Sequence, residues 1–124
     1  MISRIHDVYY SVSNSKRAIK FYTEALGMRL VNENEFWIAL DCHGVTVGLH
    51  PENNPIPQIP RDSNGAQAGA TLTLRSDNII EDRKKLEGFG AKILGEEDRH
   101  WGHMLVFEDL DGNVLKLMNP KHEH

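Results

Sequence analysis

The chain has 124 residues, a mass of 14.1 kDa and a formal net charge of −4, which fits one domain or two small modules sharing one core. Charged residues make up 26% and hydrophobic residues 40%, so the composition excludes extensive disorder and predicts no membrane span. The acidic balance, with no basic cluster, argues against a nucleic-acid partner. Cys42 is the single cysteine and the chain starts without an apolar signal segment, so we expect a cytoplasmic protein.

The first half of the chain predicts a strand, a helix and three further strands. Residues 4–12 alternate in polarity, as a strand with two unlike faces does. Residues 13–15 offer helix N-caps, and apolar residues then recur at helical spacing until Gly27, a typical helix terminator. The three strands that follow are expected at residues 28–33, 36–41 and 45–50.

The second half repeats this order after a proline-rich segment. Residues 51–68 contain four prolines and many polar residues, which predicts a linker. Asn78 is expected to cap the second helix, with Glu81 in the capping-box position and Gly90 at its end. The strands of this half are expected at residues 70–75, 91–96, 103–108 and 114–119. We therefore predict one α+β domain, residues 1–124, with module one at 1–50, the linker at 51–68 and module two at 69–120.

Two runs of residues carry a family resemblance. The first is Arg-Ala-Ile-Lys-Phe-Tyr-Thr-Glu-Ala-Leu-Gly-Met at 17–28, and the second is Glu-Asp-Leu-Asp-Gly-Asn at 108–113. Together they resemble the vicinal oxygen chelate superfamily, which includes glyoxalase I, extradiol dioxygenases, fosfomycin-resistance enzymes and bleomycin-resistance proteins. The resemblance covers residues 5–119. It implies two tandem βαβββ modules forming a curved mixed sheet around a cavity, with the helices on the outer face, and it implies a homodimer.

The resemblance also implies where a divalent metal would bind. Enzymes of this superfamily hold the metal with side chains from strands one, four, five and eight, and the matching positions here are Asp7, Gly48, Thr71 and Lys116. Only Asp7 is a metal-ligating residue, whereas zinc, nickel or iron needs three or more converging His or carboxylate donors. We therefore expect no metal and no other cofactor, and the pattern is nearest to the bleomycin-resistance-like members that work without metal. A shifted metal site built from Asp7, His50 and His103 is the alternative.

Strand alternation places many hydrogen-bonding side chains on the face opposite the apolar one, and we expect that face to line a ligand pocket. Arg75 and Lys116 suit a carboxylate or phosphate, and Trp37 or Trp101 suits a planar ring. The alternative is a buried ion pair between Asp7 and Lys116 with no ligand. The ligand-binding candidates are Asp7, Tyr9, Trp37, His50, Thr71, Arg75, Trp101, His103 and Lys116.

The functional hypothesis is a glyoxalase/bleomycin-resistance-like protein that binds or sequesters a small molecule between its modules without a metal. The alternative is a metal-dependent lyase, isomerase or dioxygenase of the same superfamily. The sequence does not identify a catalytic residue, and it leaves open whether the protein is an enzyme. The expected partners are a small-molecule ligand and a second copy of the chain, with neither nucleic acid nor membrane.

Overall fold

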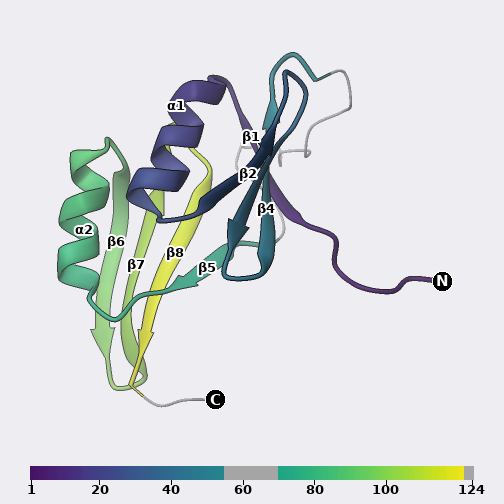
Figure 1. Ribbon diagram of the computed structural model, residues 1–124. Coiled ribbons are helices and arrows are strands. Elements are labelled where there is room, and N and C mark those ends of the chain that lie inside the picture. The colour runs from purple at the N-terminus through teal and green to yellow at the C-terminus, as the bar shows by residue number, and fades with distance from the viewer. Residues whose placement is uncertain (55–69, 122–124) are drawn as a thin grey trace, which may run out of the picture. The chain divides into compact units, whose positions relative to one another are not determined.

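The structure, a computed structural model, describes residues 1–54 and 70–121 (Figure 1). The chain divides into two compact units, Met1–Arg61 and Asp62–His124. In the described residues, each unit has a helical segment after its first strand and a four-stranded mixed sheet. The α+β class and the tandem βαβββ modules predicted from the repeat are therefore confirmed. The predicted linker at 51–68 lies outside the described residues from residue 55 onward.

The first unit has its strands in the order β1-β4-β3-β2. β1 runs parallel to β4, and the β2–β3 and β3–β4 pairs are antiparallel. Between β1 and β2 lie α1 and a one-turn π-helix, η1. The bounds are β1 Val8–Val12, α1 Ser15–Lys20, η1 Phe21–Ala25, β2 Arg29–Glu33, β3 Ile38–Cys42 and β4 Val45–Pro51.

The helix of the first unit begins as predicted but changes its hydrogen bonding before it ends. Asn14 caps it, with the side-chain oxygen accepting from the Arg17 N–H at 3.0 Å. From Phe21 the turns widen, and the Leu26 N–H donates to the Phe21 carbonyl oxygen at 3.2 Å, five residues back. Gly27 then ends the segment at a φ of 73°, a conformation that glycine adopts without a steric penalty.

The core of the first unit lies between the sheet and its helix. Strand alternation is confirmed along β1 and β3, where buried and half-buried residues alternate, whereas β4 is buried on both faces from Val47 to Pro51. Ala18, Phe21 and Tyr22 are the buried residues of the helical segment. The buried strand residues on this face are Tyr10, Val12, Ile38, Leu40, Val47 and Leu49.

Two strands of the first unit start two or more residues later than predicted. β1 starts at Val8 rather than at residue 4, because its pairing with β4 begins at the Val8–Val47 position and residues 1–6 are exposed. β3 starts at Ile38 rather than at Phe36. The Asn34 side-chain oxygen accepts from the N–H groups of Phe36, at 2.8 Å, and Trp37, at 3.0 Å. This side-chain turn keeps both aromatic residues out of the strand.

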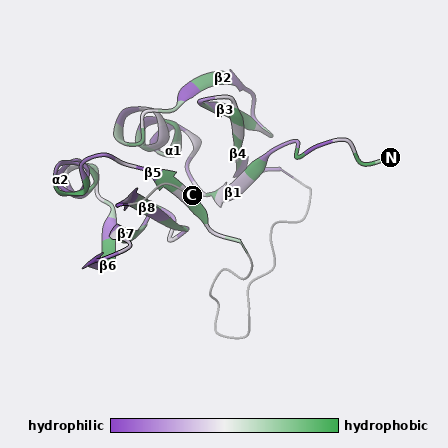
Figure 2. Cartoon of the chain, turned by 90° about the horizontal axis from the view of Figure 1, so that it is seen from below, coloured by the Kyte–Doolittle hydropathy of each residue, from purple (hydrophilic) through white to green (hydrophobic). Residues whose placement is uncertain are grey.

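The second unit repeats the topology, with strand order β5-β8-β7-β6 and a parallel β5–β8 pair. Asn78 caps α2, its side-chain oxygen accepting from the Glu81 N–H at 3.1 Å. Figure 1 shows α2 running along the sheet of β6, β7 and β8. Much of α2 is hydrophilic (Figure 2), and its buried residues are Ile79 and Leu86. The bounds are β5 Leu72–Arg75, α2 Ile79–Gly88, β6 Lys92–Arg99, β7 Gly102–Glu108 and β8 Val114–Pro120.

The acidic turn between β7 and β8 closes on one buried side chain. Asp109 is 5% exposed, and its Oδ1 accepts from the N–H groups of Asp111 and Asn113, both at 2.9 Å. The Asn113 amide donates to Asp109 Oδ2, also at 2.9 Å. Gly112 supplies the positive φ, 81°, that the turn needs. The residues of the Asp-Leu-Asp-Gly-Asn run therefore have a structural role in closing the hairpin.

No helix in the described part of the chain is long and apolar enough to cross a membrane. The cytoplasmic location expected from the sequence stays a prediction.

Candidate functional site

Three of the predicted ligand-binding residues lie together on the first unit's sheet, on the face opposite α1. Tyr9 and His50 are stacked, with ring centroids 5.7 Å apart and planes 25° apart. The Trp37 ring lies edge-on to both, at 5.5 Å from Tyr9 and 6.5 Å from His50. The three residues come from β1, the β2–β3 turn and β4, and the strand register Tyr9–Gly48 and Ser11–His50 brings them together. We call Tyr9, Trp37 and His50 the aromatic cluster.

The Trp37 indole occupies the space directly over Gly48. A Cβ atom built on Gly48 would lie 2.2 Å from Cζ2 and 2.5 Å from Cη2 of Trp37, far inside van der Waals contact. Only a glycine on β4 therefore allows the ring to lie here. The sequence signal for this contact was a lone glycine inside the apolar strand at 45–50, which indicates close approach of another group. The packing of Trp37 on Gly48 was not predicted from the sequence, where residue 48 stood only as a position without a metal ligand.

The buried His50 imidazole is the polar group of the aromatic cluster. The residue is 2% exposed, and neither Nδ1 nor Nε2 bonds to any group in the described part of the chain. An imidazole always carries at least one N–H donor, whichever tautomer or charge state it has. Leaving such a group buried and unsatisfied costs about 1–3 kcal/mol, so an unpaired buried histidine marks a place where a further partner is expected.

Asp7 lies just before β1, two residues before Tyr9. Its Oδ2 atom is 2.7 Å from Nδ1 of the exposed His6. The two residues line a cavity of about 350 Å³ formed by residues 4–8 and 44–46, all in the first unit. An ion pair between Asp7 and Lys116 would join the two units, and it stays a prediction.

The second unit carries the cationic candidates. Lys116 lies on β8 between Thr73 on β5 and Val106 on β7, and it is half-buried. Arg75, at the end of β5, is paired in register with Met118 on the same sheet face. Thr71 is exposed and just precedes β5. The register makes Lys116 the counterpart of Gly48, since each stands at the second partner position of its parallel pair, opposite Thr73 and Tyr9 respectively.

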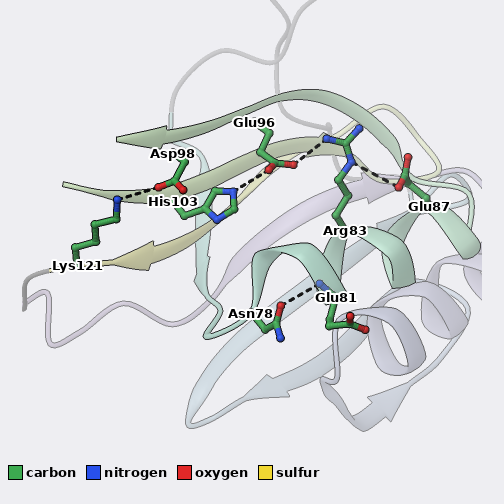
Figure 3. Close-up of polar contacts among 8 residues, drawn as sticks. All are labelled: Asn78, Glu81, Arg83, Glu87, Glu96, Asp98, His103 and Lys121. Carbon is green, nitrogen blue, oxygen red and sulfur yellow. Dashed lines mark hydrogen bonds and ion pairs between the residues drawn. The ribbon is translucent and has the colours of Figure 1, made fainter. Parts of the chain in front are cut away.

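His103 and Trp101 lie elsewhere in the second unit. His103 lies on the same face of β7 as the buried Leu105 and Phe107, because side chains two residues apart on a strand point the same way. This is the helix side of the sheet and not the Lys116 side. Its Nε2 lies 2.8 Å from Glu96 Oε2, and Glu96 Oε1 accepts from Arg83 of α2 at 2.8 Å (Figure 3). The Arg83 hydrogen bond, followed by that of His103, lowers the pKa of Glu96. Trp101 is 37% exposed in the β6–β7 turn.

The residues at the implied metal positions do not fit a metal ion. Gly48 offers no donor and is covered by the Trp37 ring, Lys116 is an ammonium, and Thr71 has only a hydroxyl. Among the described residues there is no group of three or more His, Cys, Asp or Glu side chains that could hold a metal. The shifted set of Asp7, His50 and His103 draws on both units and stays a prediction.

Cys42 does not have the surroundings of a catalytic thiol. Partial burial raises the pKa of the Cys42 thiol, and the negative charge of Asp41 raises it further. A nucleophilic cysteine needs the opposite, an electropositive environment that favours the thiolate.

Both units have the same strand order and a parallel pair between their first and last strands. The protein is therefore of the α+β class that is built from two copies of one βαβββ module. The model of the Glyoxalase/Bleomycin resistance protein/Dioxygenase superfamily matches residues 4–117, and the chain belongs to this superfamily. The metallothiol transferase FosB of Staphylococcus haemolyticus (strain JCSC1435) is 32% identical over 120 residues, covering 94% of this chain and 84% of that protein.

Solved structures share the fold. The fosfomycin resistance protein FosX from Listeria monocytogenes, complexed with Mn(II) and sulfate, has a TM-score of 0.75 at 13% identity, covering 98% of this chain and 93% of that one. TnmS3, an antibiotic binding protein from Streptomyces sp. CB03234, has a TM-score of 0.65 at 24% identity, covering 98% of this chain and 100% of that one. At these identities the likeness concerns the fold alone.

Proposed function

We propose that this protein binds a small molecule on the face of the first unit's sheet that carries the aromatic cluster, and that it does so without a metal ion. The observation that carries the proposal is the Trp37 ring over Gly48, because an aromatic side chain fills the space where a strand-four metal ligand would stand. Aromatic rings flanking one buried polar group are the usual composition of a small-molecule site.

The local chemistry supports binding rather than metal-assisted catalysis. The names of two similar proteins, a metallothiol transferase and a fosfomycin resistance protein complexed with Mn(II), point to metal-dependent relatives. This chain has a glycine and a lysine at two of the four matching positions, and neither residue donates to a metal. The name of TnmS3, an antibiotic binding protein, shows that this fold also occurs in binding proteins.

Metal analysis together with ligand screening tests the proposal. We expect protein purified without chelators to hold less than about 0.1 equivalents of Mn, Fe, Ni or Zn after dialysis. Thermal shift against a panel of aromatic antibiotics, phenazines, quinolones and acyl metabolites should find at least one compound that raises the melting temperature in the presence of EDTA. Stoichiometric tightly held metal, or a panel in which no compound stabilises the protein, would refute the proposal.

We also propose that the chain forms a homodimer. β2 is exposed along its whole length and carries Leu30 and Val31, so it is an open sheet edge of the kind that pairs with another chain. Light scattering coupled to size-exclusion chromatography should give a mass near 28 kDa, about twice the 14.1 kDa of one chain. A monomer at micromolar concentration would contradict this.

A further inference from the structure

We infer that the ligand is a planar bicyclic aromatic compound with a hydrogen-bond acceptor on its edge, and that it displaces the Trp37 indole from Gly48 to bond with His50. This inference rests on the proposed function and specifies the class of ligand for the same site. Three observations in the first unit carry it. Gly48 has no side chain, the Trp37 indole lies over Gly48, and the buried His50 imidazole has no hydrogen-bond partner among the described residues.

The place over Gly48 accepts a flat bicyclic ring, because the Trp37 indole already lies there. The floor is a residue without a side chain, and Tyr9 stands 5.5 Å from the indole at an interplanar angle of 67°, a favourable edge arrangement of aromatic rings. A ligand ring of similar size would find the same neighbours. A branched or tetrahedral molecule would not fit flat against the strand.

The Trp37 indole fills the space over Gly48 but makes no hydrogen bond with the His50 imidazole. The centroids of Trp37 and His50 are 6.5 Å apart at 86°, and the indole forms no hydrogen bond with either imidazole nitrogen. Because His50 always has an N–H to donate, a ligand with a carbonyl or ring-nitrogen acceptor would add a hydrogen bond that Trp37 does not make. Such a ligand would gain an interaction at His50 that offsets part of the entropy lost on binding, which the tethered indole does not pay.

The Trp37 side chain can leave Gly48 without disturbing the sheet, at the expense of its ring contacts with Tyr9 and His50. It is only half-buried, it precedes β3 rather than pairing within it, and it is held through its backbone by the Asn34 turn. Rotation of the side chain would uncover Gly48 and His50 without breaking a strand pair. The indole thus acts as an internal competitor, and the apparent affinity for a ligand is reduced by the fraction of molecules in which the indole is in place.

Isothermal titration calorimetry of the full chain with two matched probes tests this inference. The first probe, 2-quinolone, is a flat bicyclic lactam with both an acceptor and a donor on its edge, and the second, naphthalene, has the same fused bicyclic ring frame without either. We expect 2-quinolone to bind more tightly than naphthalene. Trp37→Ala should tighten 2-quinolone binding by about tenfold, because the competitor is removed.

His50→Phe should weaken 2-quinolone about five- to tenfold while leaving naphthalene unchanged, since only the hydrogen bond is lost. The matched control is Phe36→Ala, which removes the neighbouring aromatic side chain, 45% exposed, and should change neither affinity by more than about twofold. Imidazole ¹⁵N chemical shifts of His50 give a second measurement that does not depend on protein stability. They should move on addition of 2-quinolone and stay unchanged with naphthalene.

The outcomes separate this inference from the proposed function. If the preference for 2-quinolone over naphthalene persists in His50→Phe, or if Trp37→Ala weakens 2-quinolone, the inference is wrong while small-molecule binding stands. The same holds if neither probe binds and another compound of the aromatic panel does. Failure of the whole panel to bind overturns both.

Discussion

Gly48 and Trp37 fit together as one unit, since the indole lies where a side chain on residue 48 would have to be. The distance from a Cβ on Gly48 to Cζ2 of Trp37 would be 2.2 Å, and both residues belong to the same compact unit. The pair therefore explains why an otherwise apolar strand carries a glycine at its centre. It also places an aromatic ring at the strand-four position where the resemblance implies a metal ligand.

Gly48→Ala should destabilise the protein by about 1–3 kcal/mol, because the new methyl group forces the indole to move in a packed site. Urea unfolding of the single and double variants measures the coupling. In a Trp37→Ala background the same substitution should cost about 0.5 kcal/mol or less, since the clash is gone. Gly88→Ala in α2 is the matched control, because a Cβ there meets nothing within 4 Å and should be neutral or stabilising. Equal costs of Gly48→Ala in both backgrounds would contradict the packing described here.

Asp109→Ala should destabilise the β7–β8 hairpin by roughly 2–3 kcal/mol, because two backbone N–H groups and the Asn113 amide lose their acceptor in a buried turn. Thermal and urea unfolding measure the loss. Asp77→Ala, at an exposed position before α2, is the control and should cost less than about 1 kcal/mol. An Asp109→Ala protein as stable as this control would show that the turn does not depend on the carboxylate.

Stability at acid pH should depend on Glu96. The Arg83 and His103 hydrogen bonds lower the pKa of Glu96 below its ordinary value of 4.5, so the folded state favours the carboxylate. The resulting stabilisation is fully present above that ordinary value and is lost as pH falls through the lower folded-state pKa. Urea unfolding between pH 7 and pH 3 should therefore show a steeper acid decline for wild type than for Glu96→Gln. Glu24→Gln, at an exposed position in η1, should leave the wild-type slope unchanged, and an identical slope in Glu96→Gln would refute the assignment.

Local rules predicted most of the fold from the sequence. The elements were predicted in the correct order because their ends depend on a few neighbouring residues. These are the helix caps at Asn14 and Asn78, the helix terminator Gly27 and the Asp-Gly turn before β8. The errors occurred where a side chain or a distant partner decides the structure. Asn34 shortened β3 by turning the backbone at Trp37, and β1 began only where β4 could pair with it.

The candidate site was predicted in part, and the missing part depends on packing. Strand alternation placed Tyr9 and His50 on one face, because side-chain direction follows from period two alone. It could not reveal that the Trp37 ring crosses to β4, since this contact depends on the angle of a turn. It also gave no reason to separate His103 from the Lys116 face before the strand register was known.

Lys116→Glu should create no tight metal site, even though it places a carboxylate at a position where the resemblance implies a metal ligand. A divalent ion needs three or more converging donors, and the change supplies one while Gly48 still offers none and is covered by Trp37. Equilibrium dialysis with Mn²⁺ and Zn²⁺ should find a dissociation constant no better than that of Lys92→Glu, a control with the same charge change on exposed β6. Binding at least tenfold tighter in Lys116→Glu than in the control would mean that the other donors converge after all. In that case the metal-free proposal would fail together with the assignment of residues 7, 48, 71 and 116 to the metal positions.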